Sequence, residues 1–184
     1  MGFALLILGV ALWWAAHFFK RLMPAQRAAM GDRGKGLVTL VIVAGIVLMV
    51  VGFRMADFVP VWSPPSWTVH INNLLVLIAI WMMSPAGNKG LLLNKMRHPM
   101  LAGFRAWAIA HLLVNGDLAS ILLFGGLFVW ALVEVAVINR AEPDWTPPAP
   151  GTLIDDAKFM AASVVLLVII GYIHSWLGPW PFPG

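Results

Sequence analysis

The amino-acid sequence predicts an all-α fold: a polytopic integral membrane helical bundle of about six transmembrane helices, with a short hairpin joining the fourth and fifth. Three observations predict it: the composition, six apolar stretches, and basic residues confined almost entirely to the loops. Of the 184 residues, 61% are hydrophobic and 11% are charged, whereas soluble domains average about 25% charged residues. A chain of this length cannot bury so many hydrophobic side chains in a soluble core. We therefore expect one transmembrane domain, over residues 1–184, in a lipid bilayer.

The apolar stretches set the order of the predicted helices. They cover residues 3–19, 37–53, 68–84, 100–114, 118–138 and 159–177. A span needs about 20 residues, and five stretches fit the usual range. The fourth would extend only about 22 Å at 1.5 Å per residue. It is followed by the turn signal Asn115-Gly116-Asp117, which predicts the hairpin and an Asp117 cap on the fifth helix.

The basic residues predict the orientation of the chain. The first stretch lacks a basic region before it and has Trp13 and Trp14 where a cleavage site needs small residues, so we interpret it as a retained helix. Ten of the twelve Lys and Arg residues fall on one side if all six stretches cross; they are Lys20, Arg21, Arg27, Arg33, Lys35, Lys89, Lys95, Arg97, Arg140 and Lys158. The positive-inside rule then predicts a bacterial inner membrane protein with both termini in the periplasm. These charges indicate topology and give no nucleic-acid-binding patch.

Two kinds of loop connect these helices. Residues 141–151 contain four prolines, which predicts a stiff extended linker. Residues 60–67 and 178–184 combine proline with tryptophan, which is typical of anchors at the membrane surface. The chain has no cysteine, which excludes disulfides, thiolate metal sites and cysteine nucleophiles.

Ionisable groups inside apolar stretches are the candidate functional residues, because their burial in lipid is costly. His111 lies within the fourth stretch, on a face with Phe104, Trp107 and Ala108, and needs a partner or a metal there. His17 lies near the end of the first stretch, on a face with aromatic residues. The remaining histidines, which lie near stretch ends and suit a wet interface as well as a ligand role, are His70, His98 and His174.

Two neutral imidazoles from different helices, on faces of aromatic and small residues, suit an iron porphyrin. Zinc needs three or four ligands, and the buried carboxylate Glu134 has no Glu-x-x-His companion of the kind that di-iron sites use. Counted from the hairpin turn, Glu134 lies at the depth of Arg97 and His98, which predicts a neutralising pair with one of them. Arg105 has no such partner by this count, and we expect it to meet an anionic cofactor group or the cytoplasmic interface.

Four short motifs follow one another along the chain. They are His17-Phe18-Phe19-Lys20-Arg21, Val69-His70-Ile71-Asn72-Asn73, Arg97-His98-Pro99-Met100-Leu101-Ala102-Gly103 and Ala110-His111-Leu112-Leu113-Val114-Asn115-Gly116-Asp117. This combination resembles the NnrU family, and the resemblance covers nearly the whole chain. NnrU proteins are similar to the plant 15-cis-zeta-carotene isomerase, a membrane enzyme that contains heme b.

The resemblance implies heme b (iron protoporphyrin IX) as cofactor, with His17 and His111 as axial metal ligands. Trp107 and Ala108, which share the face of His111, and Arg97, from the Arg-His-Pro motif, complete the expected cofactor site. The bacterial family is tied to denitrification. The resemblance therefore implies a heme protein connected with nitrite or nitric oxide reduction, or an isomerase-like enzyme that acts on a hydrophobic small molecule.

Several alternatives remain open. His17 and His111 would lie at different distances from their helix ends, about 10 and 18 Å, so His70 with His111 or His17 with His98 are alternative ligand pairs. The chain can also be a non-enzymatic assembly factor for a respiratory reductase, with Gly125-Gly126 packing on a partner helix. The Arg-His-Pro stretch also resembles isoprenylcysteine methyltransferases, which use S-adenosylmethionine, but their tyrosine-rich motif is missing and Tyr172 is the one tyrosine.

Overall fold

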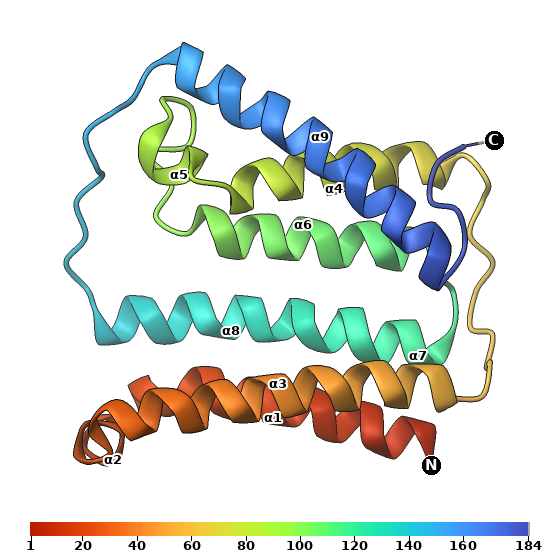
Figure 1. The fold of residues 1–184 in the computed structure, drawn as a ribbon, viewed down its shortest axis with the longest axis horizontal. Coiled ribbons are helices and arrows are strands. Elements are labelled where there is room, and N and C mark those ends of the chain that lie inside the picture. Colours follow the sequence, from red (N-terminus) through yellow and green to blue (C-terminus); the bar gives the residue numbers. More distant parts are fainter. Residues whose placement is uncertain (184) are drawn as a thin grey trace. The chain divides into compact units, whose positions relative to one another are not determined.

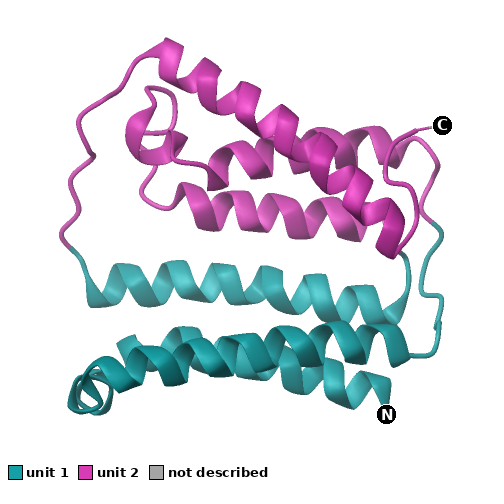
Figure 2. Cartoon of the chain, viewed as in Figure 1, with its two compact units in different colours: residues 1–63, 116–143 teal, residues 64–115, 144–184 magenta. Residues whose placement is uncertain are grey.

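A computed structural model describes residues 1–183 of the chain. It is helical, with no β-strand among those residues and two isolated bridges, Pro60 with Asp117 and Gly90 with Thr152. The chain forms two compact units, coloured separately in Figure 2. Unit 1 comprises Met1–Ser63 and Gly116–Pro143, and unit 2 comprises Pro64–Asn115 and Asp144–Gly184. Both units therefore combine two separate segments of the sequence.

Unit 1 contains the first, second and fifth predicted helices (Figure 1). Its elements are α1 (Gly2–Leu22), α2 (Pro24–Ala29), α3 (Gly31–Met55), α7 (Leu118–Ser120), the π-helical turn η1 (Ile121–Gly125) and α8 (Gly126–Ala141). The Asp117 cap is confirmed, because its carboxylate accepts hydrogen bonds from the Ser120 backbone N–H at 2.9 Å and from the Ser120 hydroxyl at 2.6 Å. The loop before this cap is tied to the segment that follows α3, since Leu118 N–H donates to the Val59 carbonyl at 2.9 Å.

Glycines hold α1 close to α3. A Cβ at Gly9 would lie 2.6 Å from the Met49 nitrogen and 2.7 Å from the Gly45 carbonyl oxygen. A Cβ at Gly52 would collide with the backbone of Leu6, which is fully buried at this contact. Small residues let helix backbones approach this closely in membrane proteins, where van der Waals packing drives helix association.

Unit 2 contains the third, fourth and sixth predicted helices (Figure 1). Its elements are α4 (Thr68–Met83), α5 (Ala86–Lys89), α6 (Pro99–Val114) and α9 (Leu153–Leu177). The α4–α6 contact also uses small residues: a Cβ at Gly103 would lie 2.7 Å from the Ala79 carbonyl oxygen, and Ala79 and Ala108 are fully buried. Of residues 141–151, predicted to be an extended linker, Ala141 ends α8 and residues 142–151 contain no helix or strand.

The start of α9 is fixed by two acidic side chains with different roles. Thr152 and Asp155 form a reciprocal capping box on the first turn. Asp156 is buried, and its carboxylate accepts the backbone N–H groups of Leu91 and Leu92 at 2.8 and 3.0 Å. Asp156 therefore joins the loop after α5 to α9, a link that the sequence analysis missed.

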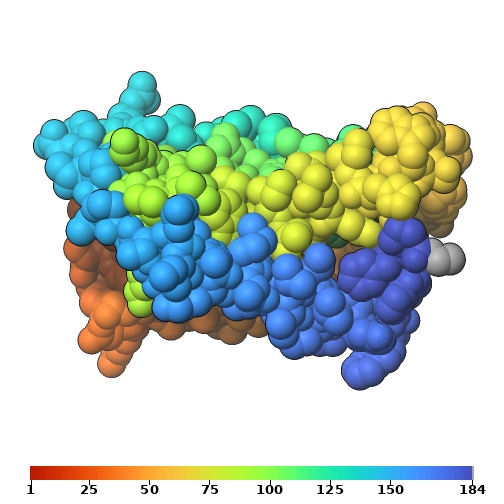
Figure 3. Space-filling view, turned by 90° about the horizontal axis from the view of Figure 1, so that it is seen from above, coloured from red at the N-terminus to blue at the C-terminus, as the bar shows by residue number. Residues whose placement is uncertain are grey.

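Three helical segments are long and apolar enough to cross a membrane: α1, α3 and Leu118–Ala141. The apolar helices α4 and α6 are shorter, and α6 at 16 residues would extend about 24 Å. Apolar side chains cover outer surfaces in both units, for example Val43, Val47 and Val50 on one face of α3. In Figure 3, α9 and the tail that follows it (residues 178–183) form part of the outer surface of unit 2. This exposure suits a lipid solvent.

Candidate functional site: two tryptophan-supported histidines

His17 lies on α1 in unit 1, one turn after Trp13. Its Nδ1 lies 2.8 Å from the Trp13 carbonyl oxygen. A carbonyl oxygen can only accept, so Nδ1 carries the proton and Nε2 carries the lone pair of the neutral ring. The imidazole centroid lies 4.2 Å from that of Trp13 and 4.8 Å from that of Trp130, which meets it edge to face. The ring is therefore fixed in tautomer and held between aromatic walls.

A buried ion pair lies one turn farther along the same faces. Arg21 Nη1 lies 3.2 Å from Glu134 Oε1, and the Glu134 side chain is only 6% exposed. Arg21 Nη2 also lies 3.7 Å from Glu142 Oε1. Among the described residues, the buried Arg21 Nε and Glu134 Oε2 have no hydrogen-bond partner. The pair therefore leaves one buried donor and one buried acceptor unsatisfied.

The predicted pairing of Glu134 with Arg97 or His98 is wrong, because its partner is Arg21. The depth count followed only the hairpin, whereas α8 also packs against α1. The signal was present in the sequence, because Arg21 lies four residues after His17 and therefore on the same helix face.

His111 lies on α6 in unit 2 and repeats the arrangement of His17. Its Nδ1 lies 2.9 Å from the carbonyl oxygen of Trp107, four residues earlier, and the two ring centroids are 5.0 Å apart. Nδ1 again carries the proton, and Nε2 carries the lone pair. Asn115 closes the helix by donating its backbone N–H and its side-chain amide to the His111 carbonyl.

The predicted cofactor-site residues divide between the two units. Trp107, Ala108 and His111 share α6, and Ala108 is fully buried. Arg97 is half-buried in unit 2, just before α6 begins, whereas His17 belongs to unit 1. Within residues 1–183 no group of three or more His, Asp or Glu residues is placed to hold a metal ion. Two axial histidines are fewer than three, so this finding does not test the predicted heme ligands.

The other ionisable candidates lie at helix ends or bond locally. His98 is the residue before α6, and His70 is exposed in the first turn of α4. Arg105 Nε donates to the Leu101 carbonyl at 3.2 Å within its own helix. His174 Nδ1 lies 2.8 Å from the Pro179 carbonyl oxygen, which belongs to the tail.

A cavity of about 360 Å³ lies within unit 2 beside His111. Its polar lining consists of Asn72, Asn73, His111 and His174, and the other lining residues are Trp107, glycine, proline, phenylalanine and aliphatic side chains of α4, α9 and the tail. The Asn72 and Asn73 amides lie 2.8 Å apart, and Asn73 Nδ2 donates to the Pro181 carbonyl at 3.1 Å. These groups are far apart in the sequence, and only the packing of α4, α9 and the tail brings them together.

Comparison with known proteins identifies a family. No curated protein and no solved structure matches the chain. The family model described as NnrU protein matches residues 5–181. Because this match covers nearly the whole chain, the protein belongs to the NnrU family.

Proposed function

We propose that this NnrU protein binds heme b in the membrane, with the imidazoles of His17 and His111 as axial ligands of the iron. One observation carries the proposal: both histidines stand four residues after a tryptophan and both hold Nδ1 against that tryptophan's carbonyl, at 2.8 and 2.9 Å. Metal-ligating histidines usually donate their second ring N–H to a carbonyl or carboxylate, which fixes the tautomer and directs the other nitrogen to the metal.

The surroundings of both rings fit a porphyrin. Trp13 and Trp130 flank His17, and Trp107 lies beside His111, so apolar aromatic surface is present to cover a macrocycle. Arg21 Nε is a buried donor without a hydrogen-bond partner among residues 1–183, and it would hold a carboxylate of the cofactor. Arg97 keeps its proposed role as a second cofactor-binding guanidinium.

The bound iron would supply one-electron redox chemistry or a position for a small ligand such as nitric oxide. The protein's part is to fix both imidazole tautomers and to exclude water with tryptophan and aliphatic side chains. The family's link to denitrification supports a role for this chemistry in nitrite or nitric oxide reduction. An isomerase-like reaction on a hydrophobic molecule and an accessory role for a respiratory reductase are the competing outcomes.

The proposed setting is the bacterial inner membrane, with six spans and periplasmic termini. In this proposal the three long apolar segments cross the membrane together with α4, α6 and α9, which makes six spans. The shortness of α6 is compatible with a hairpin whose polar turn is satisfied by protein, and Asn115 and Asp117 both bond to helix ends.

Substitution of single histidines tests the ligand assignment. We expect the His17→Ala and His111→Ala variants, purified from heme-supplied cells, to lose most of the heme per protein, as measured by the ratio of Soret to protein absorption. His70→Ala tests the alternative pair of His70 with His111, and we expect it to keep its heme because His70 is exposed at the start of α4. Full heme retention in His111→Ala with loss in His98→Ala would overturn the assignment, and heme-free wild-type protein that co-purifies with a reductase subunit would favour the accessory role.

A further inference from the structure

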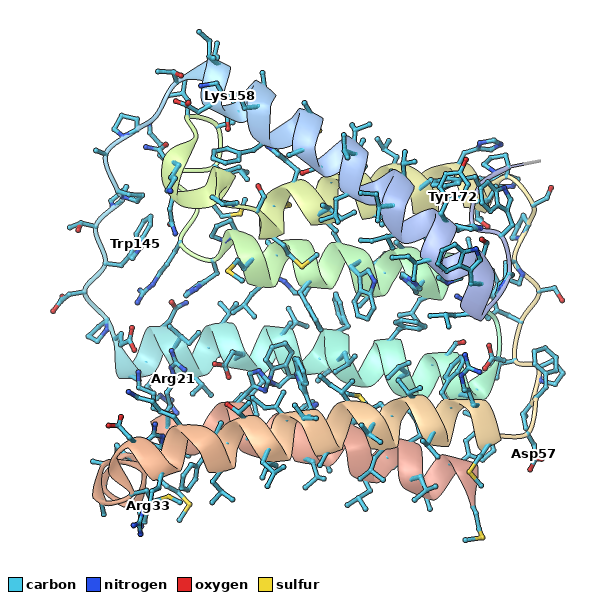
Figure 4. All side chains as sticks on the ribbon, in the orientation of Figure 1. Arg21, Arg33, Asp57, Trp145, Lys158 and Tyr172 are labelled. Carbon is cyan, nitrogen blue, oxygen red and sulfur yellow. The ribbon has the colours of Figure 1, made fainter. Side chains whose placement is uncertain are left out.

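The cavity beside His111 shares part of its lining with a second cavity along α9. The second cavity has a volume of about 420 Å³ and shares Ile80, Met83 and Ile170 with the first. Both lie wholly within unit 2. The lining residues on α9 range from Phe159 to His174, a rise of about 22 Å along the helix; Lys158 and Tyr172 mark nearly the same stretch in Figure 4. Together the two cavities therefore extend along α9, which suits an elongated ligand.

The two ends of this space differ in chemistry. In the second cavity the hydroxyls of Ser84 and Ser163 donate to the backbone carbonyls of Trp81 and Phe159, at 2.6 and 2.8 Å. Each hydroxyl proton is therefore already used, and the rest of that lining is aliphatic or aromatic. This end suits a hydrocarbon chain.

The end beside the tail offers a hydrogen-bond acceptor. His174 Nδ1 lies 2.8 Å from the Pro179 carbonyl oxygen, and in the tautomer with its proton on Nδ1, Nε2 is an acceptor. The Asn73 amide already donates to the Pro181 carbonyl. A ligand head group that donates a proton, such as a hydroxyl, matches the acceptor at His174 better than a head group that can only accept.

Aromatic side chains line the same end. Trp107 lines the cavity from α6, and Phe182 lines it from the tail, where it contacts Gly171 of α9. Trp180 stacks edge to face on both Phe182 and Tyr172, with ring centroids 5.3 and 5.6 Å apart, which fixes the tail over α9. Flat aromatic surface favours an aromatic ring as the ligand head.

We propose that unit 2 binds a phenolic lipid, with its hydroxyl donating to His174 Nε2, its ring beside Trp107 and Phe182, and its alkyl chain along α9. This site goes beyond the heme proposal and rests on it in one respect: His111, which lines the same cavity, is assigned to the iron, so His174 is the acceptor assigned to the hydroxyl. The ligand enters from a bilayer, where an alkylated phenol is concentrated by its chain.

The binding of radiolabelled 4-dodecylphenol to the full chain in lipid nanodiscs, corrected with protein-free nanodiscs, tests this site. We expect 4-dodecylanisole, in which a methyl group replaces the hydroxyl proton, and dodecanol, which lacks the ring, each to bind about tenfold more weakly. His174→Phe should weaken the phenol by about tenfold and leave the anisole unchanged. Equal affinity of wild-type protein for phenol and anisole would overturn the head-group assignment.

A matched pair of alanine substitutions tests the chain end. Ala161 and Ala162 are neighbours and both are exposed, but only Ala162 lines the second cavity. Ala162→Phe should weaken the binding of 4-dodecylphenol and of 4-dodecylanisole by about tenfold, and Ala161→Phe should weaken the binding of neither. Equal binding by these two variants contradicts the proposal. Heme absorption recorded on the same samples should be unchanged, which separates failure of this site from failure of the heme assignment.

Discussion

At the residue scale, the molecule repeats one device in two places. A tryptophan carbonyl fixes the tautomer of the histidine four residues later, once on α1 and once on α6. The sequence indicated that His111 needed a partner, since it lies within an apolar stretch. The tautomer could not be predicted, because the i−4 carbonyl is used by the ring only when the side chain turns back along its helix.

The Arg21–Glu134 pair gives a residue-scale prediction. Arg21→Met removes the partner of a buried carboxylate, and we expect it to destabilise the protein by about 3 kcal/mol. The double variant with Arg21→Met and Glu134→Leu should recover most of this loss, because no unpaired charge remains. Thermal unfolding in detergent measures both. A double variant as unstable as Arg21→Met would show that the cost is lost packing and not an unpaired charge.

At the element scale, glycine contacts and one buried carboxylate set the packing. The sequence predicted all six long helical segments to within a few residues at most ends, because hydropathy marks them directly. It did not reveal the α1–α3 glycine contacts or Asp156, because these depend on residues far apart in the chain. The sequence allows Gly126 to pack on a helix of a partner protein. In the structure its carbonyl accepts the Trp14 Nε1 proton at 3.2 Å, so this glycine has a contact within unit 1.

The helix contact in unit 1 can be tested with two glycines of α3. Gly52→Ala places a methyl group against the Leu6 backbone, and we expect a loss of about 1–3 kcal/mol. Gly36→Ala is the control, since nothing lies within 4 Å of its Cβ position, and it should be neutral or gain up to about 1 kcal/mol. Detergent-dependent unfolding followed by circular dichroism compares them, and equal stability of the two variants would refute the close contact.

The loop anchored on α9 gives a second element-scale prediction. Asp156→Ala removes the acceptor of two backbone N–H groups, and we expect a loss of about 2–3 kcal/mol and faster hydrogen exchange at Leu91 and Leu92. Asp144→Ala, in the exposed linker, should change neither. Unaltered exchange at both amides in Asp156→Ala would rule out the anchor.

At the scale of the whole molecule, the proposed orientation can be tested without a background signal, because the chain has no cysteine. Asp57 is exposed after α3, and Trp145 is exposed in the linker before α9 (Figure 4). We expect Asp57→Cys to react with a membrane-impermeant maleimide in intact spheroplasts and Trp145→Cys to react only after permeabilisation. The same accessibility for both cysteines would contradict the six-span topology.

Much of the candidate site could not be predicted from the sequence, because it depends on how distant segments pack together. Hydropathy identified His111, and the family resemblance supplied His17 as its companion. Asn73, His174 and Phe182 line one cavity only because α4, α9 and the tail pack together, and no local pattern records that packing. The tail was predicted to be a surface anchor, a role that stays a prediction, and residues 180–182 also pack on unit 2.

The optical spectrum of the wild-type protein, purified from heme-supplied cells and recorded oxidised and then reduced, tests the central claim most directly. Two imidazole ligands predict a strong Soret band that shifts on reduction, with sharp α and β bands in the reduced state. A protein that elutes as a single folded species but shows no Soret absorption would contradict the heme assignment.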